Sequence, residues 1–185
     1  MIGDSITHWW DKAGKKVWGQ YYANRDAVNL AISGDRTEHV LWRLENGNID
    51  GISPKLAVLM IGTNNHMSSP PKVTARDIRL IVKQLRTKLP KTKVLVLAVF
   101  PRGGGDDDGA RRINMTVNEL IADLGDGKMV YHLNINEAFL DGRRLRHNLI
   151  PDGTHPNEKG YAAWAEAMEP TLAKLLGEEP IIPGD

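Results

Sequence analysis

The sequence lacks cysteine, long apolar runs and an excess of charge of either sign, and each absence excludes a class of protein. Without cysteine there is no disulfide, no thiolate metal site and no cysteine nucleophile. The longest apolar runs, 56–61 and 94–100, fall well short of the roughly 20 residues that cross a bilayer, so no membrane span is expected. A formal net charge of +1 argues against nucleic acid or an anionic membrane surface as a partner. The 185 residues instead fit one globular domain.

Apolar runs alternate with segments of helical periodicity along most of the chain. Buried strands are predicted at 27–32, 55–62, 93–100 and 129–135. Helices are predicted at 36–47, 73–90, 110–125 and 157–177, the last with a kink or break at Pro170. A single domain is expected over residues 1–177, with a polar turn or mobile loop at 103–109 and a C-terminal tail at 178–185.

Strands and helices in alternation predict an α/β fold, in which right-handed crossovers build a parallel sheet with helices on both faces. Ligands of such folds bind outside the carboxyl ends of the strands. Three polar turns follow predicted strands at this position, at 3–5, 33–35 and 62–64. We therefore expect these turns to meet at one edge of the sheet.

The residues in and near these turns are those that acyl transfer by serine requires. Ser5 lies at a strand-to-helix turn, where a hydroxyl can project as a nucleophile. His155 precedes the last predicted helix and can act as the base, and Asp152 is close enough in sequence to orient the imidazole. Gly34 offers an unobstructed backbone N–H and Asn64 a side-chain amide, the donors that a developing oxyanion needs. Each residue alone is weak evidence, whereas their joint placement is hard to obtain by accident.

Four short motifs resemble the sequence blocks of the SGNH, or GDSL, hydrolases: GDSIT (3–7), SGD (33–35), GTNN (62–65) and DGTHPN (152–157). They occur in the order of that family and cover nearly the whole chain. The stretches at 34–47, 62–66 and 100–103 are similar to one branch, which contains the catalytic subunits of intracellular platelet-activating-factor acetylhydrolases and related bacterial esterases. The motif around the histidine departs from that branch and resembles many carbohydrate-directed bacterial members.

This resemblance implies a three-layer flavodoxin-like fold with a central parallel sheet of about five strands, and no metal or cofactor. It implies that Ser5 is the nucleophile, His155 the base and Asp152 the carboxylate that orients the base. The oxyanion hole would consist of the N–H groups of Ser5 and Gly34 and the side chain of Asn64. The branch includes dimers, which leaves a homodimer open.

Only Met1 and Ile2 precede the first motif. A parallel strand usually needs about five residues, so the first strand is expected to be truncated, and upstream residues are expected in the native chain. No signal peptide is visible, and the compartment stays open between the cytoplasm and secretion with an upstream leader.

The leading hypothesis is a serine esterase that hydrolyses short-chain esters, mainly acetyl esters, of carbohydrates or other small alcohols. The predicted walls of its acyl pocket are Ile6, Thr63 and Thr154, which neighbour the predicted catalytic residues and add bulk close to the backbone. One alternative is a thioesterase or a phospholipid acetylhydrolase of the platelet-activating-factor type. Another, from a different class, is a flavodoxin-like binding module in which Ser5 is inert.

Several other residues have competing interpretations. No metal site is predicted, because the remaining histidines lack metal-binding spacing: His8, His39, His66, His132 and His147. Trp9 and Trp10 suit either an interfacial anchor or the packing of the first helix onto the sheet, and packing is favoured. Asp4 better suits the orientation of backbone N–H groups than a glycosidase pair, and Arg36 suits an anion clamp or a surface ion pair.

Overall fold

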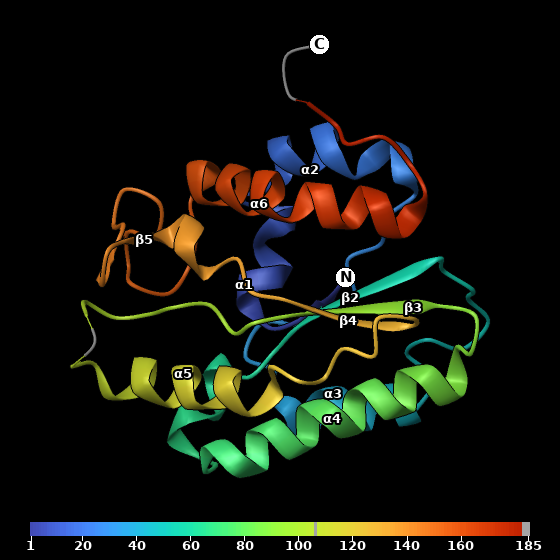
Figure 1. The fold of residues 1–185 in the computed structure, drawn as a ribbon, viewed down its shortest axis with the longest axis horizontal. Helices are drawn as coiled ribbons and strands as arrows, with labels where there is room; N and C mark the ends of the chain where they lie inside the picture. Colours follow the sequence, from blue (N-terminus) through green and yellow to red (C-terminus); the bar gives the residue numbers. More distant parts are fainter. Residues whose placement is uncertain (106, 183–185) are drawn as a thin grey trace.

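The structure of the protein, a computed structural model, describes residues 1–105 and 107–182. A sheet runs through the middle of the molecule and is covered by helices on both faces (Figure 1). One face carries α2 (Lys15–Tyr21) and α6 (Glu158–Leu176), and the other carries α3 (Thr37–Glu45), α4 (Pro71–Lys88) and α5 (Gly109–Ile121). This is the three-layer α/β architecture that the alternation of strands and helices predicts.

The sheet has four parallel strands in the order β1-β2-β3-β4. Their bounds are β1 Ile2–Gly3, β2 Leu56–Met60, β3 Lys93–Leu97 and β4 Val130–Leu133. The last three confirm the strands predicted at 55–62, 93–100 and 129–135. The first strand, β1, is only two residues long, and it pairs with β2 through Ile2 with Leu59 and Gly3 with Met60.

The strand predicted at 27–32 is wrong, so the sheet has one strand fewer than expected. The segment runs beside β1: the N–H of Leu30 donates a 2.8 Å hydrogen bond to the carbonyl of Met1, and that of Ile32 a 3.2 Å bond to the carbonyl of Gly3. The side chain of Asn29 accepts from the backbone N–H two residues further on, at 3.2 Å. Such a local turn competes with a sheet ladder. The segment is also less buried than predicted, because Val28 and Ile32 are exposed.

The four predicted helices are confirmed as α3, α4, α5 and α6, with ends shifted by a few residues, and α6 continues through Pro170 without a break. Further short elements are too brief for periodicity to reveal. They are α1 (Ser5–His8), α2, the 3₁₀ turns η1 (Trp9–Asp11), η2 (Ala23–Arg25), η3 (Thr63–Met67) and η4 (Asn136–Phe139), and a hairpin of β5 (Leu140–Asp141) and β6 (Arg144–Leu145).

Two of the predicted irregular segments extend beyond the described residues. The loop at 103–109 includes Asp106, which lies outside them, and it ends where Asp108 caps α5. The tail at 178–185 includes 183–185, which also lie outside them. Within its described part, the N–H of Ile181 donates a 2.8 Å hydrogen bond to Glu169 on α6.

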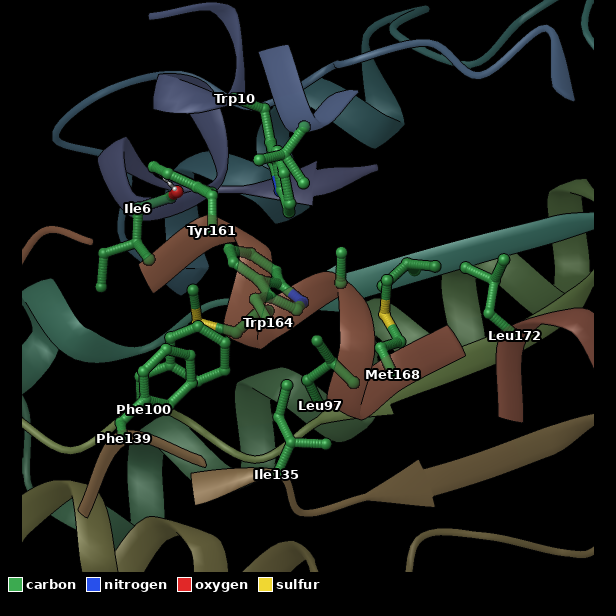
Figure 2. Packing of buried hydrophobic residues seen from close by; sticks show 14 of the residues in the cluster. Ile6, Trp10, Leu97, Phe100, Ile135, Phe139, Tyr161, Trp164, Met168 and Leu172 are labelled. Atoms are coloured by element: carbon green, nitrogen blue, oxygen red, sulfur yellow. Dashed lines mark hydrogen bonds between the residues drawn. The ribbon is translucent and has the colours of Figure 1, made fainter. Parts of the chain in front are cut away.

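The central strands supply a hydrophobic core to each face of the sheet, because successive side chains point to opposite sides. Met60 belongs to the core beneath α2 and α6, whereas its neighbour Leu59 belongs to the core against α3, α4 and α5. In the first core, Trp10 packs against Tyr161 and Trp164 at centroid distances of 4.5 and 5.0 Å (Figure 2). This packing anchors the short turn that follows β1.

Candidate active site

Ser5 begins α1 directly after β1, at the carboxyl end of the strand. Asp4 caps the helix, since its Oδ1 accepts a 3.0 Å hydrogen bond from the N–H of Ile6. This contact agrees with the interpretation of Asp4 as a residue that orients backbone N–H groups. The preceding Gly3 has no room for a side chain, because a Cβ there would lie 2.3 Å from Thr7 Oγ1.

A chain of short hydrogen bonds joins the three predicted triad residues. Ser5 Oγ lies 2.9 Å from His155 Nε2, and His155 Nδ1 lies 2.7 Å from Asp152 Oδ2. The other carboxylate oxygen, Oδ1, accepts from the N–H groups of Thr154 and His155 at 2.8 and 2.7 Å. The loop before α6 therefore holds the carboxylate at two oxygens and presents the imidazole to the serine.

The carboxylate of Asp152 determines which nitrogen of the imidazole carries the proton. Partial burial disfavours the carboxylate, but the N–H groups of His155 and Thr154 and the imidazole itself outweigh it and hold the pKa of Asp152 below its ordinary value. The carboxylate is therefore ionised at neutral pH and accepts the proton of Nδ1. Nε2 is then the acceptor for the hydroxyl of Ser5, which is the arrangement that a general base requires.

Trp9 covers one face of His155, a contact that the sequence interpretation missed. The two rings are stacked, with centroids 4.2 Å apart and planes inclined by 17°. Trp10, by contrast, is fully buried in the core and confirms the predicted packing role for one of the pair. The sequence feature that could have suggested this contact is the spacing of Ser5 and Trp9, which are four positions apart and hence about one helical turn.

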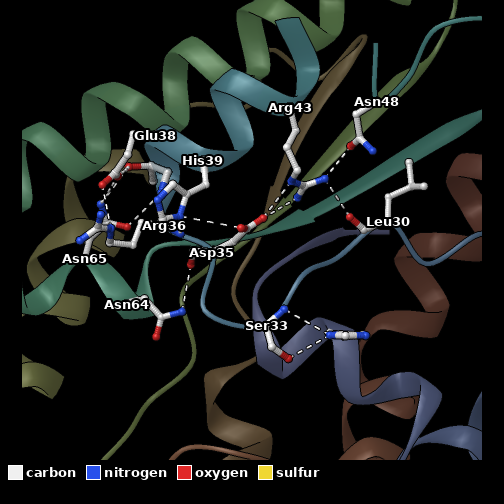
Figure 3. A network of polar contacts seen from close by, with 12 residues as sticks. Leu30, Ser33, Asp35, Arg36, Glu38, His39, Arg43, Asn48, Asn64 and Asn65 are labelled. Atoms are coloured by element: carbon white, nitrogen blue, oxygen red, sulfur yellow. Dashed lines mark hydrogen bonds and ion pairs between the residues drawn. The ribbon is translucent and has the colours of Figure 1, made fainter. Parts of the chain in front are cut away.

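Of the two predicted oxyanion donors outside α1, Gly34 lies in the loop before α3 and Asn64 lies in η3. Asn64 Nδ2 donates a 2.9 Å hydrogen bond to the carbonyl of Asp35 (Figure 3). The carboxylate of Asp35 is in turn held by Arg43, which donates two bonds of 2.9 and 2.7 Å to Oδ2. Gly34 has a φ of +85°, a conformation that favours glycine. Within the described residues the second N–H of the Asn64 amide has no partner, so the side chain is anchored and keeps a donor.

Two hydrogen bonds join the loops around the triad. The N–H of Ser33 donates to His8 Nδ1 at 3.2 Å, which connects the loop before α3 to α1. The N–H of Gly103 donates to the carbonyl of Gly153 at 2.9 Å, which connects the loop after β3 to the loop that carries His155. The expected convergence of loops at the carboxyl ends of the strands is therefore present.

Asp4 places a fully buried carboxyl group next to the nucleophile. Burial, together with the negative charge of Asp35, raises the pKa of Asp4 to about 7. The hydrogen bond from the N–H of Ile6 and the positive charge of Arg102 act in the opposite direction. Its Oδ2 is buried and has no hydrogen-bond partner within the described residues. Close to neutral pH this carboxyl group therefore gains or loses a proton.

The predicted acyl-pocket residues occupy two kinds of environment. Ile6 and Thr63 are buried, at 1% and 0% exposure, and Thr154 is half-buried. Ile6 packs into the core that contains Trp10, while Thr63 Oγ1 accepts a 3.2 Å hydrogen bond from Asn114. Each remains next in sequence to a predicted catalytic residue.

A shallow hollow of about 370 Å³ adjoins the triad. It is lined by Trp9, Ala13, Pro151, Asp152, His155, Pro156 and Asn157, and by none of the predicted acyl-pocket residues. A larger cavity of about 600 Å³ lies at the amino ends of the strands, near Met1 and Leu56, and no triad residue lines it. The hollow beside His155 is therefore the one relevant to the triad.

The remaining sequence-based interpretations concern metal binding, membrane crossing and the side chains of Arg36 and His66. No group of three or more histidine or acidic side chains suited to a metal ion occurs within residues 1–105 and 107–182. The same ranges contain no helix with the length and apolar character that a bilayer crossing needs. Arg36 forms an ion pair with Glu38 at 2.7 Å, and His66 Nδ1 contacts the carbonyl of Thr63 at 2.7 Å.

Comparison with known proteins finds similarity along most of the chain. Residues 1–163 match the model of the GDSL-like lipase/acylhydrolase family. The alpha1 subunit of platelet-activating factor acetylhydrolase IB from Pongo abelii is 35% identical over 182 residues, which cover 97% of this chain and 77% of that protein. The alpha2 subunit from Rattus norvegicus is 34% identical over 183 residues, covering 97% and 78%.

Two solved structures share the fold at lower identity. A GDSL-like lipase from Bacteroides thetaiotaomicron superposes with a TM-score of 0.76 at 19% identity, covering 94% of this chain and 86% of that one. A catalytic mutant of Axe2, an acetylxylan esterase from Geobacillus stearothermophilus, gives a TM-score of 0.70 at 18% identity, covering 96% and 93%.

Proposed function

Because the chain belongs to the GDSL-like lipase/acylhydrolase family, we propose that it is a serine esterase that removes short acyl groups, mainly acetyl, from carbohydrates or other small alcohols. The observation that carries the proposal is the hydrogen-bonded chain from Ser5 through His155 to Asp152. A nucleophile, a base and an orienting carboxylate within hydrogen-bond distance are what acyl transfer by serine requires.

In the first half of the reaction, Ser5 Oγ attacks the ester carbonyl carbon while its proton passes to His155 Nε2. The carbonyl electron pair moves onto oxygen, and the N–H groups of Ser5 and Gly34 and the amide of Asn64 are the proposed donors to that oxyanion. When the tetrahedral intermediate collapses, the bond to the alcohol breaks and the imidazolium returns its proton to the departing alkoxide oxygen.

In the second half, water replaces the alcohol. Neutral His155 takes a proton from the water as its oxygen bonds to the acyl carbon, and the same donors hold the second oxyanion. Collapse releases the carboxylic acid and returns the proton to Ser5 Oγ. Asp152 remains ionised throughout, in keeping with its lowered pKa.

Two observations support a short acyl group. The named activities of an alpha1-subunit relative and of Axe2, acetylhydrolase and acetylxylan esterase, both refer to acetyl esters. In addition, Ile6 and Thr63, which are next in sequence to Ser5 and Asn64, are packed in the interior, so neither side chain can readily move aside for a longer acyl chain. A β-branched side chain such as that of Ile6 cannot easily rotate aside.

A phospholipid acetylhydrolase of the platelet-activating-factor type is an equally supported second candidate. The acetylhydrolase subunits are relatives of more than 30% identity, and their similarity covers 97% of this chain. Both candidates release acetate by the same chemistry and differ only in the alcohol. A thioesterase, in which the departing group is a thiol, is a third use of the same triad.

The test is kcat/KM of the purified protein for three substrates: an acetylated xylooligosaccharide, a 2-acetyl glycerophosphocholine and acetyl-CoA. We expect the oligosaccharide ester to be hydrolysed fastest, with Ser5→Ala inactive on all three. A tenfold preference for the phospholipid or for the thioester would assign the corresponding alternative. Failure to hydrolyse any ester, together with failure of a fluorophosphonate to label Ser5, would identify a binding module instead.

A further inference from the structure

We propose that Trp9 is a positioning residue for His155, which it holds by ring stacking and whose cationic form it stabilises while the serine reacts. The inference rests on the proposed function, because it assigns Trp9 a part in the same reaction. Within the site the side chain of Trp9 contacts the imidazole, and the proposed role acts through that ring.

The geometry of the pair is that of a stack rather than of incidental core packing. The centroids of Trp9 and His155 are 4.2 Å apart and their planes are inclined by only 17°. The nearest aromatic pair in the core, Trp10 with Tyr161, has a centroid distance of 4.5 Å but an inclination of 54°. A nearly parallel ring at contact distance restricts rotation of the imidazole about its side-chain bonds, so Nε2 stays directed at Ser5.

A single helical turn supplies both contacts to the histidine. The N–H of Trp9 donates to the carbonyl of Ser5, so the nucleophile and the stacking ring are fixed to each other through the backbone. The next residue, Trp10, is fully buried against Tyr161 and Trp164 and prevents the turn from rotating (Figure 2). The hydroxyl and the indole therefore reach His155 as one rigid unit.

The chemistry gives the stack a role beyond orientation. In the proposed reaction His155 becomes cationic when it takes the proton of Ser5, and the face of an indole attracts a cation more strongly than a neutral ring. Stabilisation that appears only as charge develops lowers the barrier without tightening substrate binding. The expected signature of losing Trp9 is a lower kcat with little change in KM.

Two charged groups lie next to the stacked pair. The carboxylate of Asp152 lies at Nδ1 of His155, whereas the ammonium of Lys12 lies over the Trp9 ring, 5.4 Å from its centroid. Replacing Trp9 removes the ring that Lys12 contacts but no atom of the contact between Asp152 and His155. A shift in the pH dependence of a Trp9 variant would then report the lost ring face.

The experiment compares Trp9→Leu and Trp9→Phe with the wild type, using p-nitrophenyl acetate as the substrate. For Trp9→Leu we expect kcat to fall about tenfold, KM to stay within about twofold, and the acid limb of kcat/KM to move to lower pH. Trp9→Phe retains an aromatic face and should recover most of kcat. The matched control is Trp42→Leu, because Trp42 is 65% exposed on α3, outside the triad loops.

Fluorinated tryptophans at position 9 alone separate the electronic role from folding, since fluorine withdraws electrons from the ring while nearly preserving its shape. We expect kcat to fall with each added fluorine. A wild-type kcat and an unmoved acid limb in Trp9→Leu, or a kcat that does not respond to fluorine, would overturn the inference. Because the wild type and Ser5→Ala are measured alongside, loss of the proposed function would appear instead as a wild type that hydrolyses no ester, which would overturn both.

Discussion

The hydroxyl of Tyr161 on α6 donates a buried 2.6 Å hydrogen bond to the carbonyl of Ile6, the residue after the nucleophile. Burial and, next, the charge of Asp4 hold the pKa of Tyr161 above its ordinary value, so the hydroxyl remains a donor at neutral and alkaline pH. The bond ties the helix behind the triad loop to the turn that carries Ser5.

Replacing this hydroxyl should destabilise the protein. We expect Tyr161→Phe to lower the free energy of unfolding by about 1–3 kcal/mol, because a buried carbonyl loses a partner. Urea denaturation measures the change. Tyr131→Phe is the matched control, since the hydroxyl of Tyr131 makes an exposed 2.9 Å bond and should contribute little. Equal stability of the two variants would contradict the prediction.

The amide of Asn64 should matter to the rate more than to binding. An oxyanion accepts a stronger hydrogen bond than a ground-state carbonyl, so Asn64→Ala should lower kcat by about 10²–10³ and change KM little. Steady-state kinetics on an acetyl ester tests this. Asn118→Ala removes amide bonds of 2.7 and 2.9 Å to Val99 and should cost stability while retaining kcat. An effect of Asn64→Ala on KM alone would make Asn64 a substrate anchor.

Asp4 should make stability depend on pH. Its pKa is about 7 in the folded protein against an ordinary 3.8, so the folded state binds the proton more tightly. The resulting stabilisation is complete below about pH 4 and is lost as pH rises through about 7, by an order of a few kcal/mol. In Asp4→Asn, an amide oxygen can still accept from Ile6, and this fall should disappear. The measurement is urea denaturation from pH 4.5 to 8, with the exposed Asp141→Asn as control; a persistent fall in Asp4→Asn would refute the assignment.

The buried ion pair of Arg25 and Glu169 should be costly to break. The two side chains make two hydrogen bonds of 2.8 and 2.7 Å and are 9% and 4% exposed. Glu169→Gln leaves the guanidinium without its main counter-charge, and we expect a loss of about 3–5 kcal/mol in unfolding free energy. Glu166→Gln, on the exposed side of the same helix, should change stability by less than about 0.5 kcal/mol. A loss of unfolding free energy in Glu169→Gln as small as that expected for Glu166→Gln would show that the pair contributes little to stability.

Shortening Ile6 should alter the preference for acyl length. Ile6→Val and Ile6→Ala remove volume beside Ser5, so kcat/KM for butyrate relative to acetate should rise in that order. The gain should be about tenfold for Ile6→Ala if each methylene against the wall costs roughly 1–3 kcal/mol. p-Nitrophenyl esters of two, four and eight carbons provide the measurement, and thermal unfolding monitors the cost of the cavity. A wild type that prefers octanoate, or an unchanged ratio, would remove Ile6 from the acyl pocket.

Periodicity was sufficient for the long elements and for the convergence of the loops, because buried strands and amphipathic helices leave strong patterns. The prediction from periodicity failed at 27–32, where the apolar residues follow the pattern of a strand. There the side chain of Asn29 bonds locally, and β1 is too short to support a full ladder. Such competition depends on the length of the neighbouring strand and is invisible within the segment itself.

The hydrogen-bonded grouping of Ser5, His155 and Asp152 was predictable from motifs, because each residue type has a defined task in the proposed chemistry. The stacking of Trp9 on His155 was not, since it joins residues far apart in sequence through the rotation of one short turn. The pairing of Arg25 with Glu169 has the same character, because neither residue stands in a motif. Contacts of this kind depend on how helices are placed on the sheet, which local sequence does not specify.

The division of the interior into two cores has a consequence for how this enzyme can diverge. Ile6 and Tyr161, which flank the serine and histidine turns, pack in the core beneath α2 and α6, whereas α3, to which Asp35 is bound through Arg43, packs in the other. Mutations in the first core should therefore act on proton transfer, and mutations in the second on the loop that neighbours Asn64. Natural variation or directed evolution could adjust the proposed proton transfer and the proposed oxyanion donor along nearly independent paths, with the sheet limiting the epistasis between them.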